Sequence, residues 1–287
     1  MTSPSRTPRS PLSPLQERYL ALLGVPARPP GLGALRELVS AHVVRVPFEN
    51  LSKLRFRSDP GMRLPPLGRY LDGIERMHLG GTCYANNHHL AGLLAALGYD
   101  VRLCGADMSR PDVHLVSIVT LSGREYLVDA GYGAPFMDPM PLDTPHPHEV
   151  ALGSERWVLE PRGAEGRPRL TLHREGRPRH GYVVNPAPRR IEEFGGEIEA
   201  SFAPEATFMN ALVIARFTPG GSRVLRNLAL VDSDGVSSAL RTVARSADGL
   251  PDVIEEQFGI PAEFARAALA GVPLTRDAWD PDPEVTP

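Results

Sequence analysis

The sequence predicts an α+β protein built from three successive units. Apolar residues recur at helical spacing in residues 14–99, runs rich in Val, Ile and Tyr alternate with turn signals in residues 100–205, and residues 206–287 mix both patterns. Helices followed by strands favour segregated α and β layers over an alternating βαβ sheet. Residues 1–13 are mostly Ser, Thr, Pro and Arg, so we expect a flexible tail there.

The composition narrows the class of protein. The chain has 287 residues, and the 42% that are hydrophobic can bury a large core. A formal net charge of −3 provides no basic field for nucleic acid or an anionic membrane. No apolar run in the sequence approaches bilayer length, and residues 1–8 lack the apolar segment of a secretory signal. We therefore expect a soluble, cytoplasmic protein with no nucleic-acid and no membrane partner.

Two amphipathic helices are expected at the start of the chain. An apolar stripe covers residues 14–23, and Gly24 can end that helix in the left-handed conformation. A second stripe covers residues 35–43. This helix should end before Pro47, because proline disfavours helix in the residue that precedes it.

A further helix is expected to begin at or near Cys83. The loop Gly80-Gly81-Thr82 precedes this cysteine, a face of leucines follows it, and Gly98 suits the position just past the helix end. Cys83 is therefore predicted to lie close to a helix N-terminus.

Strands are expected from residue 101 onward. The first three cover residues 101–104, 113–121 and 124–130, and Ser122-Gly123 signals a tight hairpin between the last two. Further strands are expected at residues 156–159, 169–173, 181–184, 211–217 and 223–231. Helices are expected to follow at residues 237–245, 250–258 and 261–270.

Cys83 is the candidate nucleophile. A helix N-terminus favours the thiolate anion, and a neighbouring imidazole can take its proton. The other cysteine, Cys104, lies in an apolar strand and is expected to be an inert buried thiol. Two cysteines are too few for a disulfide scaffold, and His88 and His89 occupy adjacent helical positions that suit a metal poorly, so no metal site is expected.

The predicted hairpin places His114 and Asp129 on one face of the sheet. A two-residue loop at Ser122 and Gly123 puts Asp129 opposite Val116, which is two residues from His114. His114 and Asp129 are then diagonal neighbours, about 7–8 Å apart at the backbone and within reach of a side-chain hydrogen bond. A carboxylate on one ring nitrogen would fix the tautomer of a catalytic imidazole.

Structural roles compete with this interpretation. Cys83 can be read as a small buried residue, His114 as a satisfied strand histidine, and Asp129 as a residue that holds the following turn. Asp107 and Asp112 are rival partners for His114, although both belong to a loop-like stretch whose geometry the sequence does not define. Asp129 is the better candidate.

The segments around these residues resemble the active-site segments of the arylamine N-acetyltransferases. In chain order they are Gly80-Gly81-Thr82-Cys83-Tyr84 followed by Asn87, then Val113-His114-Leu115, then Tyr126-Leu127-Val128-Asp129-Ala130-Gly131-Tyr132-Gly133. Val46-Pro47-Phe48-Glu49-Asn50-Leu51 resembles an N-terminal segment of the family, and Leu225-Arg226-Asn227 and Glu256-Gln257-Phe258-Gly259-Ile260 fit its C-terminal portion. The likeness covers about residues 16–269, and several ordered segments make it specific.

The resemblance implies a fold and a mechanism. The fold would be an N-terminal helical bundle carrying the nucleophile (14–99), a central β-barrel carrying His and Asp (100–205) and a C-terminal α/β lid (206–287), around a cysteine-protease-like core. Cys83 would take an acyl group from a thioester such as acetyl-CoA and pass it to a small-molecule amine, arylamine, hydroxylamine or hydrazine, with His114 as base and Asp129 as orienter. No bound cofactor and no metal is implied. Substrate contacts would come from Phe48, Gly81, Thr82, Tyr84, Val113, Gly131 and Phe208.

This sequence also departs from the family pattern near the cysteine. Members usually carry Arg before the Gly-Gly pair and Glu two residues after the cysteine, where this chain has Leu79 and Ala85. Residues 203–208 lack the His and Ser that usually lie near the thioester donor, and the segment from Cys83 to His114 is shorter than in many members. We therefore hypothesise a non-acetyl donor, for example an acyl carrier protein thioester in a biosynthetic pathway, as for the family's macrolactam-forming amide synthases.

Two further functions use or retain the same residues. A transglutaminase-like enzyme or a thioester hydrolase has the same Cys, His and Asp order, and would let a peptide amine or water reach the thioester. A non-catalytic binding protein that kept the fold is favoured only by Leu79 and Ala85. The sequence leaves these alternatives open, together with the acceptor and the oligomeric state.

Overall fold

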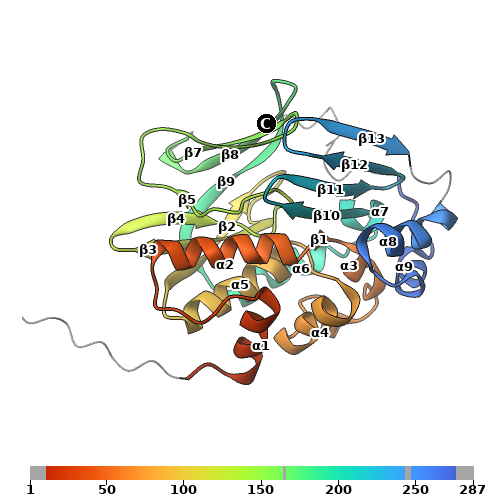
Figure 1. Cartoon of the computed structure of the whole chain (residues 1–287), viewed down its shortest axis with the longest axis horizontal. Coiled ribbons are helices and arrows are strands. Elements are labelled where there is room, and N and C mark those ends of the chain that lie inside the picture. Colours follow the sequence, from red (N-terminus) through yellow and green to blue (C-terminus); the bar gives the residue numbers. More distant parts are fainter. Residues whose placement is uncertain (1–10, 164–165, 243–246, 276–287) are drawn as a thin grey trace, which may run out of the picture.

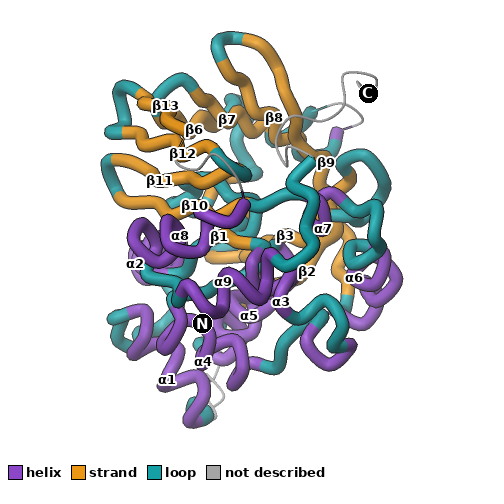
Figure 2. The backbone as a smooth tube through the Cα atoms, turned by 90° about the vertical axis from the view of Figure 1, so that its right-hand side faces the viewer, coloured by secondary structure: helices purple, strands orange, loops and turns teal. Residues whose placement is uncertain are grey.

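The helices gather on one side of the molecule and the strands on the other (Figures 1 and 2). The computed structural model describes residues 11–163, 166–242 and 247–275. The predicted α+β class is confirmed. Residues 1–10, which carry most of the expected flexible tail, lie outside the described residues. In the ranges that are described, we find no helix with the length and apolarity to cross a bilayer.

Local sequence signals set the ends of the N-terminal helices. These helices are α1 (Pro14–Leu23), α2 (Leu32–Arg45), α3 (Leu51–Arg55), α4 (Leu67–Met77) and α5 (Cys83–Ala96), with the 3-10 turn η1 (Pro60–Met62) between α3 and α4. Ser13 and Gln16 form a reciprocal capping box at the start of α1, and Gly24 ends it with φ of 62°. The helix α2 ends at Arg45, ahead of Pro47, as predicted.

An eight-stranded antiparallel sheet curls into a nearly closed barrel. Its strands are β2 (Asp100–Asp107), β3 (His114–Leu121), β4 (Arg124–Val128), β5 (Met140–Pro141), β6 (His148–Leu152), β7 (Glu155–Glu160), β8 (Arg169–Arg174) and β9 (Arg177–Arg189), in the order β5-β4-β3-β2-β9-β8-β7-β6. The helix α5 packs against β2 and β3, and its buried leucines, such as Leu90 and Leu94, join the largest core cluster.

The hairpin of β3 and β4 has the predicted register. Leu121 pairs with Arg124, and Ser122 and Gly123 form the two-residue loop. Both loop residues have positive φ, of 54° and 77°, as a type I′ turn requires. The ladder pairs Ser117 with Val128, so Asp129, just after β4, and His114, the first residue of β3, lie at the same open end of the hairpin.

A second, five-stranded antiparallel sheet joins the two ends of the chain. Its order is β1 (Phe48–Glu49), β10 (Val213–Thr218), β11 (Gly221–Arg226), β12 (Ala229–Ser233) and β13 (Ser238–Thr242). Asn50 fastens this junction: its Nδ2 donates to the Ala211 carbonyl at 2.6 Å, and its Oδ1 accepts from the Val213 amide at 2.8 Å. The remaining elements are η3 (Ile191–Phe194), α6 (Gly195–Ala200), α7 (Thr207–Asn210), η4 (Ala247–Gly249), α8 (Leu250–Phe258) and α9 (Ala262–Leu269).

Two predictions for the C-terminal part are wrong. A helix is expected at residues 237–245, but the described part of this segment forms the strand β13. Asp234 and Gly235 form a turn, so the chain returns antiparallel to β12. The single strand expected at residues 223–231 is two strands, because Asn227 turns the chain with φ of 48°. Asparagine tolerates this left-handed conformation better than most residues.

Candidate active site

Cys83 is the first residue of α5, as the sequence predicts. Its side chain is buried in a small apolar cluster with Tyr84, Leu115, Phe194 and Ile198. The amide groups of a helix N-terminus carry partial positive charge and favour an anion at this position. The fold therefore supplies one of the two conditions that generate a thiolate.

The glycine loop before Cys83 is held by buried polar side chains. The Gly80 amide donates to Glu49 Oε1 at 3.2 Å, and the Gly81 carbonyl accepts from Asn86 Nδ2 at 3.0 Å. A Cβ atom on Gly80 would lie 2.0 Å from the Pro47 carbonyl oxygen, so only glycine fits there. The loop is fixed in place before any substrate arrives.

His114 lies between Asp129 and Cys83. Its Nε2 is 2.8 Å from Asp129 Oδ2, and the Cys83 side chain is near enough to raise the pKa of the ring. Because Nε2 faces the carboxylate, the other ring nitrogen, Nδ1, is the one available to the sulfur. The three predicted catalytic residues are all buried and lie near one another, and a hydrogen bond joins His114 to Asp129.

The Asp129 carboxylate has a full set of hydrogen-bond donors. Besides His114, Oδ2 accepts from the Tyr182 hydroxyl at 2.8 Å. Oδ1 accepts from Asn87 Nδ2 at 2.8 Å and from the Gly131 amide at 3.0 Å. A carboxylate with this many donors is stabilised in its charged form and held in one orientation.

These contacts shift the protonation of the pair. Burial disfavours the charged form of His114, but the charge of Asp129 and hydrogen bonds to Asp129 and Cys83 outweigh it and raise the pKa of His114 to about 10. Burial acts to raise the pKa of Asp129, but the charge and hydrogen bond of His114, with donors such as Asn87, hold that pKa below its usual value. The site favours an imidazolium next to a carboxylate.

Gly131 lets the barrel approach the nucleophile closely. A Cβ atom on this glycine would lie 2.5 Å from Cys83 Cα and 2.8 Å from Asn87 Nδ2. Such distances are shorter than real Cβ contacts, so a larger residue would push the strand end away from α5. Gly131 therefore allows the segment that carries Asp129 to lie directly against the helix start that carries Cys83.

The rival carboxylates have other partners. Asp107 accepts from Arg167 at 2.8 Å and from the Asp112 amide at 3.1 Å. Asp112 accepts from Arg189 at 2.6 Å. Asp129 is the partner of His114.

The predicted substrate-binding residues fall into three places. Gly81, Thr82 and Tyr84 line a cavity of about 210 Å³, hereafter the Cys83 cavity because Thr82 and Tyr84 flank the nucleophile; Cys83, His114 and Asp129 are not themselves among its lining residues. Gly131 touches Cys83, and the carbonyl of Val113 accepts from the Tyr84 hydroxyl at 3.2 Å. The remaining two, Phe48 and Phe208, pack edge to face at 5.9 Å and do not line this cavity. Both residues that depart from the family pattern, Leu79 and Ala85, also line it.

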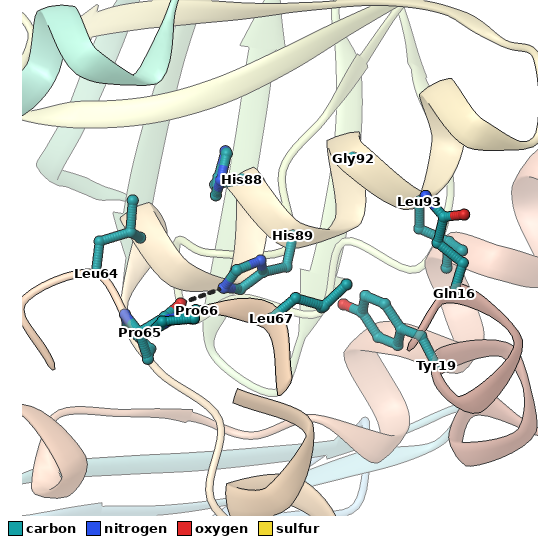
Figure 3. A pocket seen from close by; sticks show the side chains of 10 residues that line it. All are labelled: Gln16, Tyr19, Leu64, Pro65, Pro66, Leu67, His88, His89, Gly92 and Leu93. Atoms are coloured by element: carbon teal, nitrogen blue, oxygen red, sulfur yellow. Dashed lines mark hydrogen bonds between the residues drawn. The ribbon is translucent and has the colours of Figure 1, made fainter. Parts of the chain in front are cut away.

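A separate cavity of about 300 Å³ opens along the side of α5 (Figure 3). His88 and His89 line it with their ring centroids 5.1 Å apart, and His89 Nε2 lies 3.0 Å from the Pro65 carbonyl oxygen. Cys83, His114 and Asp129 are not among its lining residues. Within the described part of the chain, no three His, Cys, Asp or Glu side chains come together as a metal ligand set.

Sequence reasoning assigned no role to two residues that contact Asp129. Asn87 follows Cys83 by one helical turn, so its place on the same helix face follows from the spacing. Tyr182 lies in β9, and its contact depends on the order of strands in the barrel. No local signal marks it.

The chain is similar to a group of known transferases. The N-acetyltransferase family model matches residues 31–267. An arylamine N-acetyltransferase of Mycolicibacterium smegmatis is 31% identical over 257 residues, which cover 84% of this chain and 90% of that protein. The crystal structure of Nocardia farcinica arylamine N-acetyltransferase superposes with a TM-score of 0.75 at 28% identity, covering 91% of this chain and 95% of that one. The Mycobacterium marinum arylamine N-acetyltransferase in complex with CoA has a TM-score of 0.74 at 24% identity, covering 90% and 99%.

Proposed function

The chain belongs to the arylamine N-acetyltransferase family, and we propose that it moves an acyl group, acetyl by default, from a CoA thioester through Cys83 to an amine. The observation that carries this proposal is the buried hydrogen bond of 2.8 Å between His114 and Asp129, with Cys83 at a helix start near enough to raise the pKa of His114. Each member has a role that its environment favours. Cys83 is the nucleophile, His114 the proton carrier and Asp129 the group that orients the imidazole.

The first half-reaction acylates the cysteine. The Cys83 thiolate attacks the thioester carbonyl, and the carbon–sulfur bond to CoA breaks as the tetrahedral intermediate collapses. The departing CoA sulfur takes the proton that His114 received from the Cys83 thiol. The products are free CoA and an acyl-Cys83 thioester, with His114 neutral.

The second half-reaction releases the acyl group to the acceptor. An amine attacks the acyl-Cys83 carbonyl, and His114 accepts the proton that the amine loses as the new C–N bond forms. The Cys83 thiolate leaves, next to an imidazolium that Asp129 stabilises. The enzyme returns to its starting state, so the two substrates react in turn.

The donor and the acceptor are assigned from the family. The Mycobacterium marinum relative is described in complex with CoA, which supports a CoA thioester as donor here. The relatives' names support an arylamine acceptor. A carrier-protein donor, the amide-synthase reaction and the hydrolase or transglutaminase-like reactions draw no support from the site geometry and stay predictions of the sequence. We also propose a cytoplasmic location, which suits a chain whose two cysteines are both free thiols.

Acylation of the cysteine tests the proposal directly. The protein is incubated with acetyl-CoA and its intact mass is measured, followed by peptide mapping. We expect one acetyl group on Cys83. It should be absent from Cys83→Ala and retained in Cys104→Ala, because the wild-type Cys104 thiol is buried and burial raises its pKa to about 11. Addition of an arylamine should discharge it. Acetylation that persists in Cys83→Ala, or discharge as fast in water as with the amine, would contradict the proposal.

A further inference from the structure

The sequence has 31 lysine and arginine residues, and Lys53 is the only lysine among them. It lies in α3 with only 8% of its surface exposed, and it lines the Cys83 cavity. Buried lysines are rare unless they are paired. Its place next to the candidate nucleophile therefore needs an explanation.

The ammonium group of Lys53 has few partners. Nζ donates to Ser201 Oγ at 2.5 Å and lies 3.9 Å from the centroid of the Phe202 ring. Among the described residues, no carboxylate lies within ion-pair distance of it. An ammonium group has three donors, so two of them face the cavity or neighbouring apolar atoms. A buried cation without a counter-charge is costly, and an anion in the cavity would remove that cost.

A second cation lies on the same ring. The Arg63 guanidinium is 4.7 Å from the Phe202 centroid and lines the Cys83 cavity. Its Nε is 2.9 Å from Glu199, which is 65% exposed. The carboxylates that line the cavity are engaged elsewhere: Asp72 pairs with Arg18 at 2.8 Å, and Asp59 accepts from the Gly61 amide at 2.9 Å. Lys53, Arg63 and Arg69 are the cations of the cavity lining, and Asp59 and Asp72 are its carboxylates, so cations outnumber carboxylates there.

Acylation changes the charge that Lys53 faces. A negative charge on the Cys83 sulfur raises the pKa of Lys53 and so favours its protonated form. Once an acyl group is attached, the sulfur is neutral and this counter-charge is lost. A carboxylate at the far end of the acyl group would replace it, whereas an acetyl group would leave Lys53 uncompensated.

We propose that Lys53, assisted by Arg63, forms a carboxylate subsite that selects acyl groups ending in a carboxylate, such as a malonyl group, over neutral ones. This inference rests on the proposed acyl-Cys83 reaction and specifies its donor. The bond changes are those of the first half-reaction, and the distal carboxylate takes no part in them. Lys53 binds and positions the acyl group.

The environment of Lys53 gives the subsite a pH dependence. Burial lowers the pKa of Lys53 to about 7, the Cys83 thiolate opposes this shift, and Arg63 adds to it. Asp59, Arg69 and Asp72 are the other charged groups that line the cavity. A bound carboxylate favours the ammonium form, so the preference for an anionic acyl group should weaken as pH rises above about 7.

Matched acyl-CoA donors test the subsite. Malonyl-CoA and isovaleryl-CoA differ in that a carboxylate in the first is replaced by an isopropyl group of similar shape in the second. The rate of CoA release and the mass of the acyl-enzyme are measured for both and for acetyl-CoA. We expect the kcat/KM of acylation to favour malonyl-CoA over isovaleryl-CoA by about 10- to 100-fold, the range expected for a hydrogen bond to a charged group. Equal rates would overturn the subsite.

Variants separate binding from a purely structural role. Lys53→Met keeps the chain length without the charge, and Lys53→Arg keeps the charge. We expect the malonyl-to-isovaleryl ratio to fall about 10- to 100-fold in Lys53→Met and to be largely kept in Lys53→Arg. If Lys53 only holds Ser201 in place, both donors slow together and the ratio is unchanged, which overturns the proposal.

The single lysine also allows a measurement on the wild-type chain. Protein labelled with ¹³C at lysine Cε gives one side-chain signal, whose shift with pH reports the pKa of Lys53. We expect that pKa to rise when Cys83 carries a malonyl group and not when it carries an isovaleryl group. An acyl group found on Lys53 Nζ, or an identical titration in both acyl-enzymes, contradicts the subsite. Failure of all three donors to acylate Cys83 instead defeats the proposed function.

Discussion

Two buried charged groups near the candidate nucleophile, Asp129 and Lys53, have different surroundings. On one side, the Asp129 carboxylate accepts from His114, Tyr182, Asn87 and the Gly131 amide. On the other side, Ser201 Oγ is the hydrogen-bond acceptor for the Lys53 ammonium among the described residues. The two groups are similarly buried, so burial does not explain the difference.

This difference suggests two roles: one set of groups is already arranged for the reaction in the free protein, and the other gains a partner only when a ligand binds. The Asp129 side is complete in the free protein, which holds the imidazole in position at no further cost when substrate binds. The Lys53 side is incomplete, so a ligand atom can improve it. The Asp129 side should therefore govern the rate with every donor, and the Lys53 side should govern the choice between donors.

The largest expected effect comes from the Asp129 side. His114→Gln keeps a polar side chain but cannot carry a proton between the sulfur and the leaving group. We expect kcat/KM to fall by about 10⁴-fold with acetyl-CoA and with malonyl-CoA alike. Steady-state kinetics with both donors measure this loss, and the exposed His146→Gln serves as a control. A loss of kcat/KM that differs between acetyl-CoA and malonyl-CoA would contradict the separate roles of the Asp129 and Lys53 sides.

A methyl group at residue 131 should act on the same side through geometry. Gly131→Ala places a Cβ 2.5 Å from Cys83 Cα, which forces the strand end and α5 apart. We expect about a 100-fold loss of kcat/KM, since small displacements of reacting groups have effects of this order. The free energy of unfolding should fall by about 1–3 kcal/mol.

Urea unfolding and kinetics on the same preparation measure both quantities. Gly92→Ala, within α5 itself, is the control, because nothing lies within 4 Å of its added Cβ. That variant should be neutral or slightly more stable, since alanine favours a helix interior. A Gly131→Ala protein with unchanged activity would show that the close approach is not needed.

Removal of one donor from Asp129 should have a smaller effect. Tyr182→Phe deletes the hydroxyl that donates to Oδ2 at 2.8 Å and leaves the contact with His114. We expect kcat/KM to fall about 10-fold with both donors, because a hydrogen bond to a charged group is worth about 1.5–3 kcal/mol. Tyr99→Phe loses a hydroxyl that donates to the Gly31 carbonyl instead and is the control. A change in the ratio of kcat/KM for malonyl-CoA to that for isovaleryl-CoA would show that the Asp129 side also affects donor choice, which contradicts the separate roles of the two sides.

The smallest effect is a pH dependence of stability. The raised pKa of His114, about 10, contributes stability that is full below its unfolded-state pKa of about 6.5 and is lost as pH rises toward 10. The lowered pKa of Asp129 contributes stability that is present above about 3.9 and is lost as the solution becomes more acidic.

We therefore expect the stability difference between wild type and Asp129→Asn to be largest between about pH 4 and 6.5 and to shrink toward pH 10. Urea unfolding at a series of pH values measures it. A difference that grows with pH would mean that His114 is neutral in the folded protein.

The catalytic side of the comparison was largely predictable from the sequence. The glycine loop and the following leucines place Cys83 at a helix start, and Ser122-Gly123 fixes the register that brings His114 to Asp129. Both are local signals, because a helix end and a two-residue turn are determined by the conformational preferences of a few neighbouring residues. The same kind of signal, Asp234-Gly235, precedes β13, where the helix expected at residues 237–245 is wrong.

The sequence by itself thus determined the α+β class, the ends of α1, the C-terminal end of α2 and the start of α5, and it named the three candidate residues of the site. Only the tertiary structure decided which groups surround them: Tyr182 reaches Asp129 through the barrel order, Asn50 ties the N-terminal helices to β10, and Lys53 is buried in the cavity that Thr82 and Tyr84 line. The physical reason is that turns and caps are satisfied within a few residues, whereas burial and distant hydrogen bonds depend on how the whole chain packs.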